Sequence, residues 1–139
     1  MNVMAIQTES ELLDIADQFR EELVARGNEI DKNRYLPQDL ADKLASLGFY
    51  RLVAPEPLGG LGVSPEFFCR ICESLAKGNG STAWCVFIGA TSQYLFGALP
   101  TSQLKKMLAN PNVITSGVFA DSGTAVSYTH LTLPTMQVV

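Results

Sequence analysis

The chain has 139 residues and a mass of 15.1 kDa, which suits one domain, or one domain and the start of a second. Hydrophobic residues make up 47% and charged residues 17%, a balance that excludes an intrinsically disordered chain. With 10 Lys and Arg against 14 Asp and Glu and a pI near 4.9, the chain lacks the basic surface of a nucleic-acid-binding protein.

The N-terminal sequence MNVMAIQTESELL has no basic stretch followed by an apolar one, so it does not have the pattern of a secretory signal. The chain contains 3 cysteines, and an odd number without a signal argues against a disulfide framework. We therefore expect a cytoplasmic protein.

Two amphipathic helices are predicted at the start of the chain. Thr8 and Glu11 have the spacing of a capping box, and apolar residues then recur at helical spacing as far as Gly27. The polar residues 28–35 predict a connection. Residues 36–48 predict a second, shorter helix with leucines on one face.

A glycine-rich connection follows. Residues 49–63 (FYRLVAPEPLGGLGV) predict a brief extended run and then a loop, since prolines and glycines crowd the second half. Gly59, Gly60 and Gly62 allow the backbone to turn tightly or to present N–H groups to an anion. We interpret the segment as a connection between helices.

The second half of the chain predicts further helices and then a strand. Residues 65–78 predict a helix capped by Ser64. Residues 81–99 carry no charge, but their polar and glycine residues make a poor membrane span, so we expect a central helix enclosed by others. Residues 101–110 predict a short helix, and the alternating, β-branched residues 112–120 predict a strand.

Few residues of this sequence suggest chemistry. Cys69 and Cys72 form a C-x-x-C pattern, which can hold zinc or exchange thiols. The pair lies within a predicted helix without a second pair or a histidine nearby, so we interpret it as two buried thiols and predict no metal site. His130, the only histidine, has no partner that would make it a general base. We therefore predict no catalytic residue in this chain.

Aromatic residues gather in the predicted central helix, at Trp84, Phe87, Tyr94 and Phe96. By default such residues belong to the core of the domain. The alternative is that they border a ligand pocket.

The order of these features resembles the N-terminal region of the acyl-CoA dehydrogenase superfamily of flavoproteins, over about residues 36–126. An L…LG helix leads to a P…GG.G turn, a helix ending in LA…S.A, a buried helix, a Q…L helix and a strand. The resemblance implies a mainly α fold, the N-terminal helical domain of the acyl-CoA dehydrogenase fold (1–110) plus the first strand of its middle β domain (111–126).

Two branches of the superfamily fit this pattern. The segment FADSGTA stands where the dehydrogenases usually have a TEP..GSD loop, and together with GNGSTAW it looks more like the flavin-dependent monooxygenases. The resemblance thus implies a flavin-dependent oxidoreductase. A monooxygenase of aromatic or steroid-like substrates is favoured over a dehydrogenase that oxidises the Cα–Cβ bond of an acyl-CoA. A non-enzymatic helical interaction domain is the alternative from another class.

The resemblance also implies where the ligands bind. The flavin, FAD or reduced FMN, would lie along residues of the expected loop: Phe119, Ala120, Ser122, Gly123 and Thr124. N–H groups of such a loop can meet the ring edge where negative charge develops on reduction. Trp84 would border the pocket of a small-molecule substrate. The resemblance further implies a flavin reductase or electron-transfer partner and a homotetrameric parent protein whose catalytic residues lie in its C-terminal part.

The end of the chain has a different character. Residues 126–135 (VSYTHLTLPT) match the translation of GTCTCTTATACACATCTGACGCTGCCGACG, which resembles the end of a transposase-type sequencing adapter. We therefore interpret residues 127–139 as a non-native tail on a truncated gene, which removes His130 from the candidates. We expect the chain alone to be inactive and prone to self-association.

Overall fold

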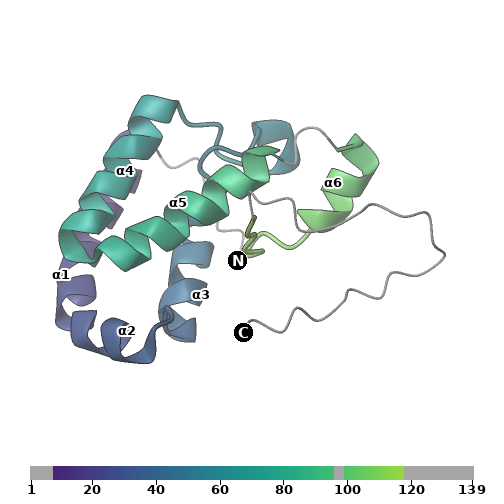
Figure 1. Ribbon diagram of the computed structural model, residues 1–139. Coiled ribbons are helices and arrows are strands. Elements are labelled where there is room, and N and C mark those ends of the chain that lie inside the picture. The colour runs from purple at the N-terminus through teal and green to yellow at the C-terminus, as the bar shows by residue number, and fades with distance from the viewer. Residues whose placement is uncertain (1–7, 96–98, 118–139) are drawn as a thin grey trace, which may run out of the picture.

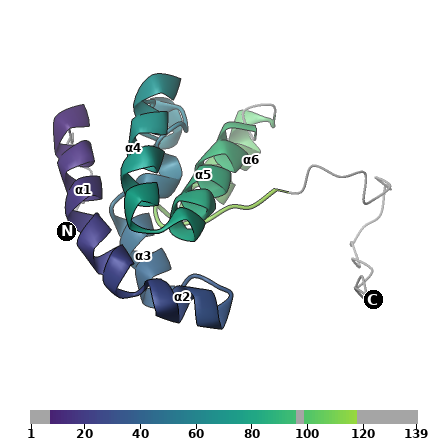
Figure 2. The same cartoon turned by 60° about the vertical axis from the view of Figure 1, so that its left-hand side comes forward.

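The computed structural model describes residues 8–95 and 99–117, and this part of the chain is helical (Figure 1). Its helices, in chain order, are α1 (Glu9–Ala25), α2 (Gly27–Asn33), α3 (Gln38–Ser46), α4 (Pro65–Gly78), α5 (Gly80–Leu95) and α6 (Thr101–Met107), with 3-10 turns η1 (Phe49–Arg51) and η2 (Glu56–Leu58) between α3 and α4. Helix α4 lies between α1 and α5 (Figure 2). This arrangement confirms the mainly α fold.

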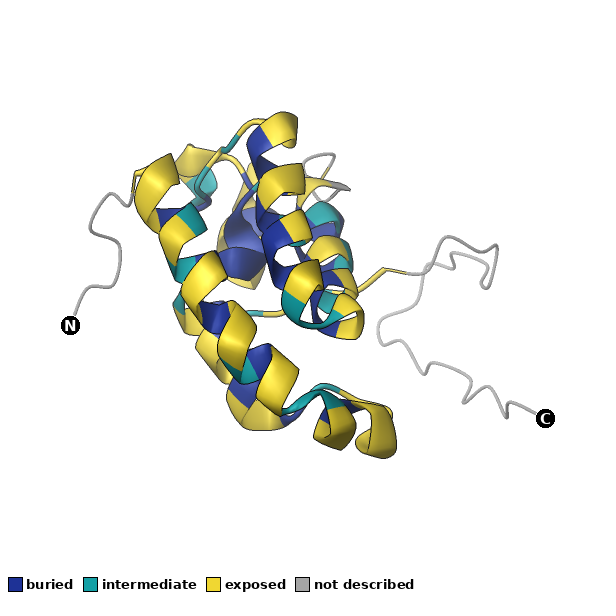
Figure 3. Ribbon diagram, turned by 90° about the vertical axis from the view of Figure 1, so that its left-hand side faces the viewer, coloured by how far each residue is buried: buried dark blue, intermediate teal, exposed yellow. Residues whose placement is uncertain are grey.

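Helix α1 begins as its sequence predicts. The Thr8 side chain accepts a hydrogen bond from the Glu11 N–H, and the Glu11 carboxylate accepts one from the Thr8 N–H, which completes the capping box. Helix α1 then packs closely on α4, because Gly78 has no side chain: a Cβ there would lie 2.9 Å from the Arg20 carbonyl oxygen. Buried residues therefore gather where the helices face one another (Figure 3).

Helix α2 occupies most of the segment that we predicted as a polar connection, so that prediction was wrong. Ile30 is its one buried residue. The Arg26 side chain, at the junction with α1, donates hydrogen bonds to Glu29 of α2 and to Asp39 of α3. Tertiary contacts from two residues therefore stabilise a helix that has almost no apolar periodicity.

The glycine-rich connection is tightly folded. It begins with the 3-10 turn η1 rather than with the predicted extended run. The N–H groups of Leu61, Gly62 and Val63 all donate to carbonyls of the preceding segment, at 2.9–3.0 Å. A Cβ at Gly60 would lie 1.9 Å from the Ala54 carbonyl oxygen. These N–H groups are therefore used inside the turn, which supports the interpretation as a connection rather than an anion site.

The Arg51 side chain joins this turn to α6 by hydrogen bonds. It is 4% exposed, and its guanidinium donates to the Gly59 carbonyl at 2.9 Å and to the Leu108 carbonyl at 2.6 Å. Burial lowers the pKa of Arg51. The buried cation thus holds the C-terminal end of α6 against the segment that precedes α4.

The predicted strand is not found in the described part of its range. Residues 113–117 form neither helix nor strand, because a strand needs a neighbouring strand for its backbone hydrogen bonds and the described residues supply none. The remaining predicted strand residues, 118–120, lie outside the described residues.

Candidate functional site

The open face of helix α5 is where the structure departs most from the sequence-based expectation. Trp84 is 64% exposed, Tyr94 67% and Phe87 38%, so the prediction of an enclosed helix with core aromatics was wrong for these residues. Among the described elements, α4 and turn η1 make the most contacts with α5, and Trp84 and Tyr94 are exposed. Phe96 lies outside the described residues.

Two of the exposed aromatics, Trp84 and Phe87, form a continuous row with the core. Phe87 stacks on the buried Phe68 of α4, with ring centroids 5.5 Å apart, and Trp84 stacks on Phe87 at 5.7 Å. Stacking at these distances fixes the orientation of the indole. Trp84 is therefore held on the surface by the packed ring beneath it.

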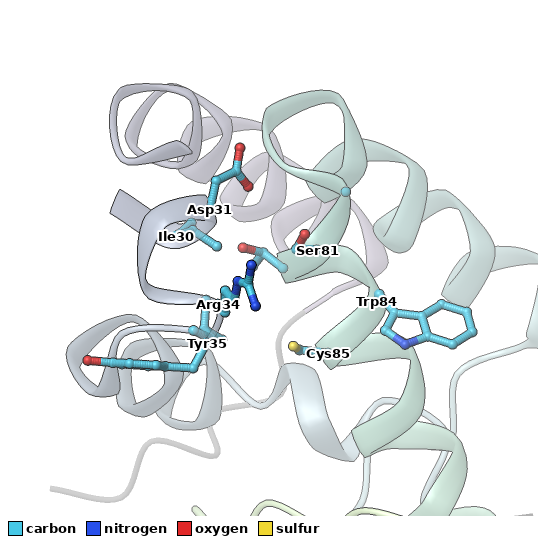
Figure 4. Close-up of a pocket in the computed structure, with 10 residues that line it drawn as sticks. Ile30, Asp31, Arg34, Tyr35, Ser81, Trp84 and Cys85 are labelled. Carbon is cyan, nitrogen blue, oxygen red and sulfur yellow. The ribbon is translucent and has the colours of Figure 1, made fainter. Parts of the chain in front are cut away.

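A pocket of about 470 Å³ lies beside the N-terminal half of α5 (Figure 4). Asp31, Arg34 and Tyr35 come from α2 and the turn after it. Trp84 and Cys85 line the α5 side, with the indole extending away from Arg34 (Figure 4). Asp31 and Arg34 carry opposite charges, so the pocket has no dominant sign.

A second pocket, of about 380 Å³, shares Leu36, Trp84 and Cys85 with the first and is more apolar. Its other lining residues come from α3, η1, α5 and the segment after α6: Ala41, Tyr50, Ile88, Gly89, Ile114, Thr115 and Ser116. We call this second pocket the α5 pocket. Its size and apolar character are typical of a site for a small organic ligand.

The segment after α6 closes one side of the α5 pocket. The Gln93 side chain, 1% exposed, donates to the Val113 carbonyl at 3.2 Å, and the Thr115 hydroxyl donates to the Gly89 carbonyl at 3.0 Å. These bonds place residues 113–117 along α5. The last described residues therefore lie next to this pocket.

Of the predicted ligand residues, only Trp84 lies within the part of the chain that the structure describes. Trp84 lines both pockets, and its role at a substrate site stays a prediction. The predicted flavin residues, Phe119, Ala120, Ser122, Gly123 and Thr124, lie outside the described residues, as does His130. The sequence analysis did not single out Tyr50. The only signal for it was an aromatic hydroxyl within the apolar run that starts the glycine-rich connection.

The thiols differ from the predicted buried pair. Cys69 is exposed and Cys72 is half-buried on α4, so neither thiol is fully buried. Burial, and then the neighbouring Cys69, raises the pKa of Cys72 to about 12. Across residues 8–95 and 99–117, no group of three or more His, Cys, Asp and Glu side chains is placed to hold a metal ion.

The described residues form a helical bundle with an exposed aromatic helix face and an apolar pocket beside it, and exposed apolar surface of this kind is typical of a domain that contacts further protein. The chain belongs to the acyl-CoA dehydrogenase family: the family model "Acyl-CoA dehydrogenase, N-terminal domain" matches residues 7–110. This match confirms the resemblance seen in the sequence. No helix within the described ranges is long and apolar enough to cross a membrane.

Named relatives include both oxygenases and a dehydrogenase. The chain is 36% identical over 104 residues to indole-3-acetate monooxygenase of Acinetobacter baumannii, covering 74% of this chain and 26% of that protein. It is 36% identical over 59 residues to the oxygenase subunit HsaA of a flavin-dependent monooxygenase of Rhodococcus jostii, covering 42% and 15%. It is 29% identical over 102 residues to benzylmalonyl-CoA dehydrogenase of Aromatoleum aromaticum, covering 73% and 25%. The chain thus spans about a quarter of the length of the first and third of these relatives.

Proposed function

We propose that this chain is the N-terminal helical domain of a flavin-dependent monooxygenase that acts on a small aromatic or steroid-like substrate. The observation that carries the proposal is the similarity to indole-3-acetate monooxygenase, at 36% identity over 104 residues. The α5 pocket supports it, since an apolar cavity bordered by Trp84 suits an aromatic ring. The interaction-domain alternative has no comparable support.

The role of the chain's own residues in this function is binding rather than chemistry. Trp84, held by Phe87, would form one wall of the substrate pocket. Residues 113–117 lie against α5 beside this pocket, so the next residue in the chain follows directly from the border of the pocket. This placement supports a flavin, FAD or reduced FMN, held from Phe119 onward. The flavin would supply the oxygenating chemistry when bound.

The parent protein in this proposal is a longer, cytoplasmic homotetramer that receives reduced flavin from a reductase. The name of HsaA as an oxygenase subunit supports the separate reductase. The division at residue 126 and the adapter-derived tail belong to the same proposal. Resequencing the locus from an independent library tests it, and a native stop codon after Val139 would refute the truncation.

The second candidate function is an acyl-CoA dehydrogenase. The similarity to benzylmalonyl-CoA dehydrogenase favours it, at 29% identity over 102 residues. The lower identity and the absence of a Thr-Glu-Pro loop after the helical domain make it the weaker candidate.

The test of the proposed function uses the full-length protein obtained from the resequenced gene. We expect oxygen consumption with an aromatic acid and reduced flavin, and no reduction of an electron acceptor with acyl-CoA. Trp84→Ala should raise KM for the aromatic substrate with less effect on kcat, because Trp84 contributes binding. Val24→Ala, on the exposed surface of α1, is the matched control and should change neither constant. Acceptor reduction by acyl-CoA without oxygen-dependent turnover would overturn the proposal.

A further inference from the structure

The first pocket, of about 470 Å³ between α2 and the start of α5, contains a cation that the fold does not use. We call it the α2 pocket. Arg34 lines it, and its guanidinium forms no hydrogen bond or ion pair with a described residue. Figure 4 shows this guanidinium between the end of α2 and the first turn of α5. A positive charge in this position can bind an anion that enters the pocket.

Asp31, which also lines the α2 pocket, does not neutralise Arg34. Among the described side chains no ion pair joins the two, and the Asp31 carboxylate extends away from the guanidinium (Figure 4). On the α5 side, Ser81 contributes a hydroxyl, and a Cβ added at Gly80 would meet no neighbouring atom within 4 Å. Open space therefore lies beside Arg34, with a hydroxyl as a further hydrogen-bonding group.

The fold does not require an arginine at position 34. Arg34 ends α2 with a φ of 57°, in the left-handed region that favours glycine. Its backbone N–H donates to the Ile30 carbonyl at 3.0 Å, a bond that glycine would form equally well. The side chains of Arg26 and Arg51, in contrast, hold elements of the fold together. The Arg34 side chain is therefore free to serve a ligand.

The α2 pocket adjoins the apolar α5 pocket, since Leu36, Trp84 and Cys85 line both. The Trp84 indole extends away from Arg34 (Figure 4), and it is held in place by stacking on Phe87. A ligand that occupies both pockets would place a negative group beside Arg34 and an apolar, aromatic body beside Trp84.

We propose that the two pockets form one site for a small aromatic carboxylic acid, and that Arg34 binds its carboxylate. A guanidinium presents two parallel N–H groups, which match the two oxygens of a carboxylate. The inference rests on the proposed function only in identifying this acid with the substrate class of the parent enzyme. Arg34 is thus a specificity-determining residue, which selects an acid over a neutral compound of the same shape.

The test uses the 139-residue chain with 5-fluorotryptophan incorporated, since Trp84 is its only tryptophan and gives a single ¹⁹F signal. The chain is titrated at neutral pH with phenylacetate and with phenylacetamide, which has nearly the same shape but no charge. We expect Arg34→Gln to lower the phenylacetate-to-phenylacetamide affinity ratio about two- to fivefold, as for the loss of a solvent-exposed ion pair. Added salt should weaken the binding of phenylacetate alone, because salt screens exposed charges.

Arg20→Gln is the matched control. Arg20 is exposed on α1 and lines neither pocket, and its replacement changes the net charge by the same amount. Its affinity ratio should equal that of the unchanged chain. Arg34→Gly separates binding from folding: it should lower the ratio as Arg34→Gln does, whereas the free energy of unfolding should stay equal or rise, because glycine favours the φ of 57°.

An unchanged ratio in Arg34→Gln, an equal fall in Arg20→Gln, or a ¹⁹F signal that neither compound shifts would overturn the inference. A loss of stability in Arg34→Gly would also count against it, since the side chain would then serve the fold. The titration involves no flavin, so a full-length protein without oxygenase activity would refute the proposed function and leave the carboxylate site intact.

Discussion

Gly60 is the residue whose lack of a side chain the fold requires most directly. A Cβ there would lie 1.9 Å from the Ala54 carbonyl oxygen, which also accepts the Gly62 N–H at 3.0 Å. The atom that a Cβ at position 60 would meet belongs to the backbone, which cannot move aside as the end of a flexible side chain can. An alanine at this position would therefore force the turn to open. We expect Gly60→Ala to lower the free energy of unfolding by about 1–3 kcal/mol, measured by urea denaturation.

The control for this prediction is Gly80→Ala. Gly80 is the first residue of α5, and a Cβ there meets no atom within 4 Å. Alanine restricts the unfolded chain, so the stability should stay equal or rise by up to about 1 kcal/mol. Equal losses in both variants would show that the close approach at Gly60 is unimportant.

The cysteines should react in a fixed order. Cys69 is exposed, whereas burial raises the pKa of Cys72 to about 12 and also raises that of Cys85. Since the thiolate is the nucleophile, iodoacetamide in mildly alkaline buffer should modify Cys69 first, as measured by peptide mass spectrometry. All three thiols should react alike in urea. Early modification of Cys72 in the folded chain would contradict this assignment.

At the scale of the elements, α2 depends on the Arg26 side chain. Hydrogen bonds from Arg26 hold the pKa of Glu29 and of Asp39 below their ordinary values of 4.5 and 3.8. A carboxyl with a lowered folded pKa adds stability above its unfolded pKa and loses it as the pH falls through the folded value. Arg26→Gln should therefore destabilise the chain slightly at neutral pH, and by nothing in strong acid. Urea denaturation over a pH series measures the difference.

Lys77→Gln is the matched control for Arg26→Gln. Lys77 pairs with Glu73 within α4 at 3.0 Å and joins no two elements. Hydrogen exchange at the α2 amides should accelerate in Arg26→Gln and stay unchanged in Lys77→Gln. Equal exchange in the two variants would mean that α2 is held by Ile30 alone.

Helices α1 and α4, which the sequence predicted, each have a repeating apolar face and a recognisable start. Thr8 caps α1, and Ser64 accepts the Phe67 N–H at 3.1 Å to cap α4. Helix α2 was missed because its sequence has almost no apolar periodicity, and because Arg26 also bonds to Asp39 of α3, which is 13 residues away in sequence. Periodicity reports which residues are apolar, but not which partner covers them.

For the whole molecule, the site could be predicted only in part, because a sequence pattern does not report which distant residues come together. The order of motifs was enough to identify the family. The role of Trp84 as a pocket residue remains a prediction. The α5 pocket could not be predicted, because it joins Leu36, Tyr50 and Ile114 from separate parts of the chain. The exposure of Trp84 could not be predicted either, since a core face and an interdomain face have the same apolar composition.

The open face of α5 should make the 139-residue chain self-associate. Trp84, Phe87 and Tyr94 lie on this one helix, and stacking between the first two makes their surface continuous. The sedimentation coefficient of the chain should therefore rise with protein concentration, and Trp84→Gln should weaken this dependence. Val24→Gln is the control, because Val24 is 61% exposed on α1, apart from that row. A chain that stays monomeric at all concentrations, or an equal effect of both substitutions, would show that α5 is not the associating surface.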